Sequence, residues 1–150
     1  MIDSEWRDEW IVAEPEAGYW SKNDFLFQDE TRTIIGICME IHRILGKGFS
    51  EVVYKDALQW ELEQRQILFE REKQYKVHYK EIVLKRSYAA DFVVFDKIIV
   101  EVKAQEGMAE ANASQVINYL AVSKCPVGLL INFGENSLKF KRFALTKNYN

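Results

Sequence analysis

The stretch that decides the fold runs from residue 89 to residue 103 and reads AADFVVFDKIIVEVK. Two apolar segments rich in β-branched residues stand on either side of a polar pair, Asp96 and Lys97, which is the pattern of a β-hairpin. Three charged residues interrupt these segments: Asp91, Glu101 and Lys103. Because a buried charge without a partner is costly, we expect these side chains to contact one another or a shared ligand.

The spacing within this hairpin makes a geometric prediction. Glu101 and Lys103 are two residues apart in one strand, so their side chains point to the same face. A two-residue turn at Asp96 and Lys97 would pair Asp91 with Val102, which would turn the two carboxylates to opposite faces. A shared cation therefore requires a loop of odd length or a β-bulge, and we predict one of these.

With such a register, Asp91 and Glu101 can bind a divalent cation such as Mg²⁺ or Mn²⁺, and the carbonyl of Val102 can add a ligand. Lys103 can then orient or activate a water, or stabilise charge on a phosphate. The competing interpretation is an ion pair in which Lys103 neutralises one carboxylate and nothing is catalysed. The spacing of the three residues does not decide between these two interpretations.

The rest of the chain predicts one α/β (α+β) domain over residues 30–150, with a mixed sheet flanked by helices in the order ααβββαββ. The first helix starts near Asp29 or Thr31 as its cap and ends at Gly46, and Ser50 caps a second helix. Ile82–Leu84 either extends a preceding strand or forms a strand of its own. The other expected elements are strands at Phe69–Tyr79, Tyr88–Phe95, Ile98–Ala104, Val127–Asn132 and Leu138–Leu145, and a helix at Met108–Val122.

Residues 1–29 differ from this domain and form an acidic, tryptophan-rich N-terminal extension. Residues 1–30 hold nine acids and two bases, a net charge of −7, whereas the other residues hold fourteen acids and eighteen bases, a net charge of +4. The basic balance of the domain permits a nucleic-acid partner. A protein partner or a second copy of the chain is expected to dock through the extension. Without a targeting signal or a long apolar run, the expected location is cytoplasmic, with no membrane partner.

Four further polar residues allow two interpretations each. Glu51 opens the second helix, where it either stabilises the helix N-terminus or points toward a metal. Gln115 and Tyr119 lie one helical turn apart, as an ordinary core tyrosine with a polar neighbour or as part of a site. His42 lies at the polar edge of the first helix and is more often a hydrogen-bonded histidine than a ligand.

The stretch LGKGFSEVVY, residues 45–54, resembles the signature of the GxxExxY proteins, which belong to the PD-(D/E)xK nuclease-like superfamily. The signature residues are Gly48, Glu51 and Tyr54. The resemblance covers about residues 30–145. It continues in the same order along the chain, through His42, Ala90-Asp91, Glu101-Val102-Lys103, residues 115–120 and residues 127–134.

This resemblance implies a restriction-endonuclease-like core and a nuclease dependent on Mg²⁺ or Mn²⁺ that hydrolyses phosphodiester bonds, with DNA as the first candidate substrate and RNA as the second. Asp91 and Glu101 would bind the metal, with Glu51 assisting, and Lys103 would be the catalytic lysine. Gln115 and Tyr119 would match the Q-x-x-x-Y motif near the site.

The alternative is a non-catalytic module that binds nucleic acid or protein on the same scaffold. In that case the phosphates of a nucleic acid would be contacted by basic residues near two strands. These residues are Arg71, Lys73, Lys76, Lys139, Lys141 and Arg142. Binding that weakens steeply with salt but needs no divalent metal would indicate this alternative.

Overall fold

The structure is a computed structural model that describes residues 10–13 and 27–147. A six-stranded sheet forms its centre, with the strand order β1-β6-β5-β4-β3-β2. The helices are α2 (Gln28–Leu45), α3 (Glu51–Gln64) and α4 (Glu110–Ser123). The strands are β1 (Trp10–Ala13), β2 (Phe69–Tyr79), β3 (Ile82–Val94), β4 (Ile98–Lys103), β5 (Val127–Asn132) and β6 (Lys139–Lys147).

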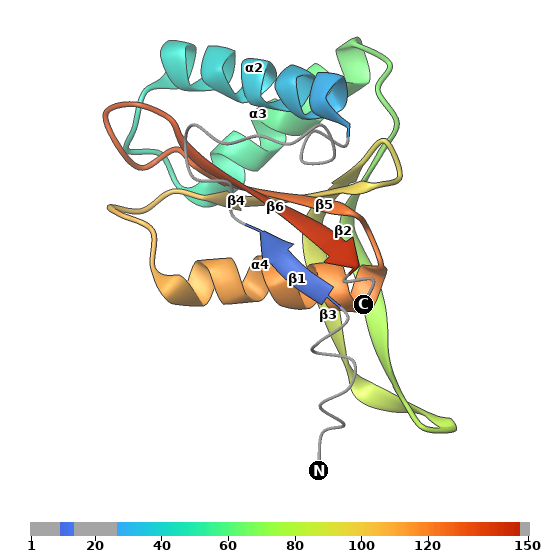
Figure 1. Cartoon of the computed structure of the whole chain (residues 1–150). Coiled ribbons are helices and arrows are strands. Elements are labelled where there is room, and N and C mark those ends of the chain that lie inside the picture. Colours follow the sequence, from blue (N-terminus) through green and yellow to red (C-terminus); the bar gives the residue numbers. More distant parts are fainter. Residues whose placement is uncertain (1–9, 14–26, 148–150) are drawn as a thin grey trace.

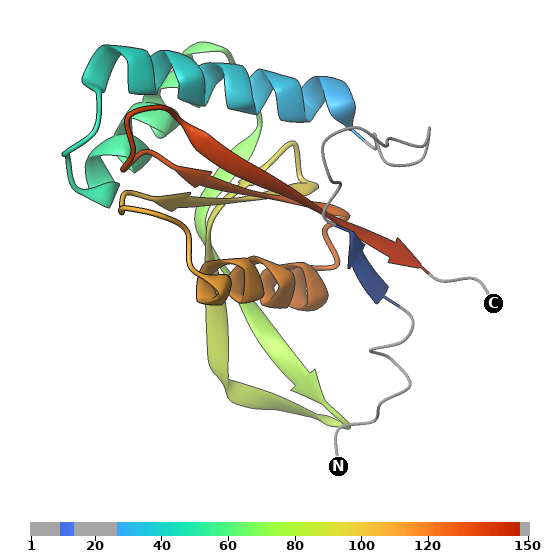
Figure 2. The same ribbon diagram turned by 60° about the vertical axis from the view of Figure 1, so that its left-hand side comes forward.

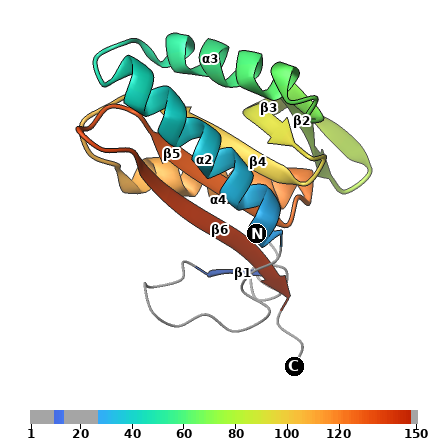
Figure 3. The same cartoon turned by 90° about the horizontal axis from the view of Figure 1, so that it is seen from above.

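Helices cover both faces of this sheet (Figure 1), with α2 and α3 on one face and α4 on the other. Figure 3 shows α2 and α3 crossing above β4 and β5. The strands β4 and β5 are the one parallel pair among the described residues, and α4 is the crossover between them. The predicted fold class and the element order ααβββαββ are confirmed from residue 28 onward.

Each face of the sheet has its own apolar core. Phe92, Val100 and Leu129 belong to the core under α2 and α3, whereas Val93 and Ile99 belong to the core that includes Leu120 of α4 and Phe143 of β6. Because both faces of β4 and β5 are covered, these strands are apolar along almost their whole length. Glu101 and Lys103 are the charged residues of the otherwise apolar strand β4, so each of them calls for a local explanation.

The helix ends correct part of the sequence prediction. Gly46 ends α2 with a φ of 68°, as expected of a glycine after a helix. The start of α2 is earlier than predicted, because Phe27 holds the cap position and neither Asp29 nor Thr31 does. Ser50 does precede α3, but its side chain makes no capping hydrogen bond.

The hairpin of β2 and β3 is longer than the sequence pattern indicated. Ile82–Leu84 and Tyr88–Val94 belong to one strand, β3, whose pairing with β2 shifts register between Lys76 and His78. The intervening residues are all exposed, so no apolar alternation marks them as strand. Figure 2 shows this hairpin projecting away from the sheet and past α4.

Part of the N-terminal extension lies within the sheet, because β1 pairs antiparallel with β6. Of its three tryptophans, Trp10 lies in β1, and the other two, Trp6 and Trp20, lie outside the described residues. The two cysteines, Cys38 and Cys125, are buried free thiols. Within the described ranges, no helix combines the length and apolar character needed to span a membrane.

Candidate active site

The hairpin of β3 and β4 has the odd-length connection that the sequence analysis predicted. Val94 pairs with Ile98 and Phe92 pairs with Val100, so three residues, 95–97, form the loop. Phe95 and Asp96 adopt positive φ angles in this loop. Continuing the same register by one residue brings Asp91 opposite Glu101, so the prediction of an odd loop is confirmed.

At this point the two carboxylates replace the hydrogen bonds of the strand ladder. The backbone N–H of Asp91 donates to Oε1 of Glu101 over 2.9 Å. The backbone N–H of Val102 donates to Oδ2 of Asp91 over 2.8 Å. Each carboxylate is thus held between the two strands by the backbone of the other strand. Both residues are buried, Asp91 at 7% and Glu101 at 2% exposure.

The strand β3 also breaks its alternation at this point. Ala90 and Val93 both belong to the core under α4, although an ordinary strand would turn residues three apart to opposite faces. On the neighbouring strand, Glu72 has a φ of 55°. The irregular backbone turns Asp91 toward α3, where its carboxylate meets a lysine.

That lysine, Lys55 of α3, joins three carboxylates from three elements. Its Nζ lies 2.7 Å from Oδ1 of Asp91, 3.3 Å from Glu51 and 3.7 Å from Glu72. Burial alone would lower the pKa of Lys55, but the ion pairs with Asp91 and Glu51 outweigh it and raise the pKa. The ammonium is therefore a fixed positive charge among the acids.

Glu101 has the most perturbed carboxyl among the described residues. Burial, followed by the negative charge of Asp91, raises its pKa to about 8, against the opposing effect of Lys103. Two adjacent buried carboxyls thus share a site in which one of them holds a proton at neutral pH in the absence of another cation. A strongly perturbed acid beside a specific charged partner is a feature of functional sites.

Lys103 ends β4, and the loop after it is fixed by β5. Phe133 donates its backbone N–H to the carbonyl of Lys103 over 2.8 Å. The side chain of Asn132, fully buried, accepts from the N–H of Gln105 and donates to the carbonyls of Gln105 and Gly107. These bonds fix the direction in which the chain leaves the site.

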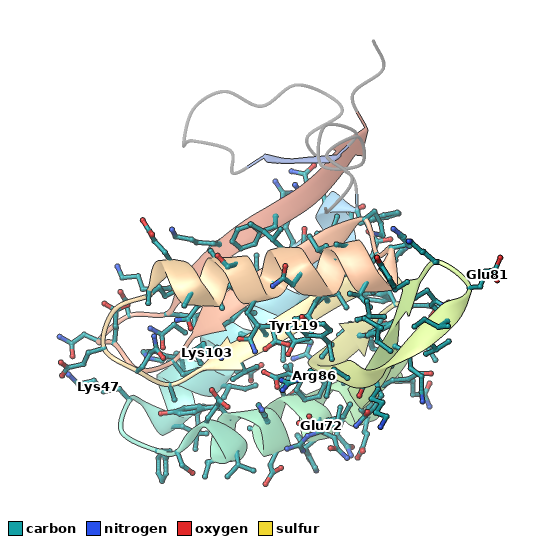
Figure 4. All side chains as sticks on the ribbon, turned by 90° about the horizontal axis from the view of Figure 1, so that it is seen from below. Lys47, Glu72, Glu81, Arg86, Lys103 and Tyr119 are labelled. Atoms are coloured by element: carbon teal, nitrogen blue, oxygen red, sulfur yellow. The ribbon has the colours of Figure 1, made fainter. Side chains whose placement is uncertain are left out.

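Tyr119 and Gln115 of α4 lie together on the Glu101 side of the sheet. Gln115 donates from Nε2 to the hydroxyl of Tyr119 over 3.1 Å. Burial and the charge of Glu101 raise the pKa of Tyr119. In the view of Figure 4, Tyr119, Lys103 and Arg86 lie between α4 and α3, while Glu72 lies beside α3. The spacing of Gln115 and Tyr119 thus corresponds to a hydrogen-bonded pair close to the carboxylates.

The remaining motif residues hold the link between α2 and α3. The hydroxyl of Tyr54 donates to the carbonyl of Gly46 over 2.6 Å, and its ring stacks on Phe133 at 4.6 Å. Gly48 has a φ of 114°, which an L side chain rarely adopts. His42 hydrogen-bonds through Nε2 to the carbonyl of Glu135 over 2.8 Å. His42, Gly48 and Tyr54 therefore shape the loops, whereas Glu51 reaches the acidic cluster through Lys55.

The basic residues expected to bind phosphate do not form one surface. Arg71 pairs with Asp56 at 2.7 Å, and Lys73 pairs with Glu70 at 3.0 Å. Both belong to β2 at one edge of the sheet. Another group lies on β6, beyond β5, β4 and β3 in the strand order. Lys76 is exposed, and the β6 group consists of Lys139, Lys141 and Arg142.

The donor set fits a hydrated divalent cation with few protein ligands. Among the described residues, no three His, Cys, Asp or Glu side chains are grouped closely enough to hold a metal ion by themselves. Asp91 and Glu101 nevertheless supply adjacent hard oxygens, and Mg²⁺ usually keeps several waters while it binds one or two carboxylates. In this structure the ammonium of Lys55 is the positive charge that pairs with the carboxylate of Asp91.

Sequence reasoning missed Lys55, Glu72 and Asn132. Lys55 had a local signal, since Glu51 precedes it by four residues on the helix. Asn132 lies in the stretch 127–134 that carries the family resemblance, but its role depends on a loop that is distant in the sequence. Glu72 had no signal, because its role depends on an irregular strand.

Two comparisons with known proteins agree with this geometry. A family model described as the PD-(D/E)XK nuclease superfamily matches residues 28–143. The crystal structure of SSO0001 superposes with a TM-score of 0.51 at 17% sequence identity, over 83% of this chain and 61% of that chain. At this identity the likeness concerns the fold, and the chain spans less than two thirds of that protein. No curated protein matches the chain.

The chain belongs to the PD-(D/E)XK nuclease superfamily, since the family model covers most of its length. Asp91, Glu101 and Lys103, predicted from the sequence as the site, follow the order of acid, acid and lysine in the superfamily's name, and Ala90 precedes the aspartate. They come from β3 and β4, the two strands that the carboxylates link.

Proposed function

We propose that this protein is a divalent-metal-dependent nuclease that hydrolyses phosphodiester bonds of DNA at Asp91, Glu101 and Lys103. The observation that carries the proposal is the pair of buried carboxylates that replace ladder hydrogen bonds beside Lys103. An apolar strand pair of a purely structural kind would not retain two adjacent buried acids at such a cost.

In this proposal the side chains have separate roles. Asp91 and Glu101 hold Mg²⁺ or Mn²⁺, helped by the carbonyl of Val102, and the bound ion supplies Lewis-acid stabilisation of charge on the phosphate. Lys103 orients the attacking water and stabilises the negative charge that develops at phosphorus. Glu51 assists through Lys55, and Tyr119 with Gln115 borders the carboxylates.

We further propose that, within the superfamily, the chain is a GxxExxY protein. Gly48, Glu51 and Tyr54 support this assignment. Tyr54 fixes the turn at Gly46, and Glu51 then starts the helix that carries Lys55 to Asp91. The motif would thus link a structural turn to the acidic cluster.

Cleavage assays test the proposed function. The full chain is incubated with plasmid DNA, labelled duplex and single-stranded DNA, and RNA, in Mg²⁺, in Mn²⁺ and in EDTA. We expect cleavage of DNA in the presence of metal only. The variants Asp91→Asn and Glu101→Gln keep an acceptor for the backbone N–H but lose the charge, and Lys103→Met loses the ammonium. Each is expected to reduce the rate by roughly 100-fold or more.

The matched control is Glu63→Gln, which removes an exposed carboxylate of α3 outside the cluster. Cleavage at the wild-type rate in a folded Asp91→Asn or Lys103→Met variant would refute the proposed roles. Salt-sensitive binding of DNA without cleavage in either metal would instead favour a non-catalytic binding module on this scaffold.

A further inference from the structure

In the part of the chain that the structure describes, the outer part of the β2–β3 hairpin, residues 76–88, is mostly exposed, and Tyr88 at its inner end packs edge-on against Tyr119. Its residues from His78 to Tyr88 are all exposed, and Figure 2 shows the two strands extending past α4. We name residues 76–88 the arm. Because Asp91 lies in β3, the strand that forms one side of the arm, the arm is joined directly to the candidate site.

The charge of the arm differs from that of the whole chain. It holds four bases and one acid, a net charge of +3, whereas the chain has a net charge of −3. Among the described residues, none of the four bases forms an ion pair, in contrast to Arg71 and Lys73 at the base of the same hairpin. The four bases are Lys76, Lys80, Lys85 and Arg86.

The tip of the arm is apolar as well as basic. Ile82 is 57% and Val83 is 47% exposed, and they continue into Leu84. Tyr79 lies under the ammonium of Lys80, at 5.4 Å from its ring centre. Positive residues that flank exposed apolar ones fit a partner with phosphates on both sides of a groove that also offers apolar contacts, as the thymine methyl groups do in the major groove of DNA.

The pairing of the two strands is irregular at one point in the arm, close to Arg86. The pairing passes from Lys76 with Ser87 to His78 with Val83, so one residue of β2 faces three residues of β3. Such a bulge bends the strand and redirects its side chains. Arg86 is one of the bulged residues, and Figure 4 shows it on the side of Tyr119, between α4 and α3.

We propose that the arm binds in the major groove of duplex DNA beside the cleaved bond, with Lys80, Lys85 and Arg86 on the phosphates. A two-stranded β-ribbon is one of the elements that the major groove of B-form DNA admits, whereas the major groove of A-form RNA is deep and narrow. From Asp91 to Ile82 the strand spans about 30 Å, or about nine base pairs. The proposal takes the position of the cleaved bond from the proposed function.

Salt-dependent binding tests the arm without cleavage. Anisotropy of a labelled DNA duplex of about 20 base pairs is measured with the full chain in EDTA at several salt concentrations. The variant Lys80→Gln/Lys85→Gln/Arg86→Gln is compared with Arg32→Gln/Arg43→Gln/Lys47→Gln, which removes three exposed bases of α2 and the turn after it. Both variants change the net charge by the same amount.

The slope of log affinity against log salt is negative, and we expect the arm variant to reduce its magnitude by about 2 to 3. The control variant should leave the slope nearly unchanged. On duplex RNA the two variants should behave alike. If the triple arm variant does not fold, its three single variants are used, each expected to lower the slope by about 1.

Three results would overturn the arm proposal: no binding of the wild-type chain to duplex DNA, equal slopes for the arm and control variants, or the same arm effect on single-stranded DNA or duplex RNA. The proposed function is tested separately. If the salt slope depends on the arm but no metal supports cleavage, the arm binds DNA and the proposed nuclease activity is refuted. If the chain cleaves DNA but the arm and control variants have equal slopes, the nuclease activity stands and the arm proposal is refuted.

Discussion

Asp91 and Glu101 show how one pair of residues can serve both the backbone and a ligand. Each carboxylate accepts a hydrogen bond from the backbone of the other strand, which uses one oxygen of each. The second oxygen of Asp91 meets Lys55. The carboxyl oxygens are thus fixed in place before any cation arrives, which is the preorganisation that metal-dependent chemistry needs.

A first prediction concerns the proton on Glu101. In the metal-free protein its pKa is about 8, against 4.5 for an ordinary glutamate. Between these values the folded state binds more protons than the unfolded state, so the free energy of unfolding falls as pH rises, by up to about 1.4 kcal/mol per pH unit. Thermal unfolding in EDTA should therefore show wild-type stability decreasing from about pH 5 to about pH 8 relative to Glu101→Gln.

The difference between the two proteins isolates this group, because all other titrating residues are common to both. Glu101→Gln keeps an oxygen that can accept the N–H of Asp91, so the strand contact remains. Parallel curves for the two proteins over this pH range would show that Glu101 does not carry a raised pKa.

A second prediction concerns Lys55. Its ammonium competes with a divalent cation for the carboxylate of Asp91, at 2.7 Å. Lys55→Met should therefore strengthen binding of Mn²⁺ by roughly 1 kcal/mol, or about fivefold. Calorimetric titration measures this, with the exposed Lys47→Met as the control of equal charge. Unchanged or weaker binding in Lys55→Met would mean that Lys55 holds the acids together rather than competing for them.

At the scale of elements, a third prediction concerns the contact between β5 and the loop after β4. A Cβ on Gly134 would fall on the backbone nitrogen and oxygen of Gln105, which cannot move aside as a flexible side chain could. Gly134→Ala should destabilise the protein by about 1–3 kcal/mol and displace the loop that follows Lys103. Denaturant unfolding measures the loss, and cleavage assays show its effect on the site.

Gly36→Ala is the matched control for that substitution. Gly36 lies within α2, and a Cβ there would meet nothing within 4 Å. Alanine should leave stability unchanged or increase it by about 0.5–1 kcal/mol, since glycine is a poor helix former. If both alanine variants behave alike, the close approach at Gly134 is not what fixes the loop.

The elements themselves were largely predictable from the sequence. Apolar periodicity located α2, α3, α4 and the strands β2, β4, β5 and β6, because these elements bury one face or both. The outer half of β3 was not predictable, since exposed residues carry no periodic signal. The cap at Phe27 was also missed, because no side chain of the usual capping type holds it.

At the scale of the whole molecule, the order of elements and the odd hairpin loop followed from the sequence, but the arrangement of the site did so only in part. The triplet of Asp91, Glu101 and Lys103 could be located because charges stood within apolar strands. The broken alternation at Asp91, which brings it to Lys55, depends on Glu72 and on packing against α3, and no local pattern indicates it. The roles of these residues stay predictions until they are tested.

The central claim is that Asp91 and Glu101 together hold one divalent cation beside Lys103. Calorimetric titration of the 150-residue chain with Mn²⁺ near pH 8 tests it most directly, with Asp91→Asn, Glu101→Gln and the surface control Glu63→Gln measured alongside. We predict one binding site in the wild-type and control proteins, and affinity at least tenfold weaker in both site variants, a loss of about 1.4 kcal/mol or more. Absence of binding to the wild-type protein, or equal binding by a folded Asp91→Asn variant, would contradict the claim.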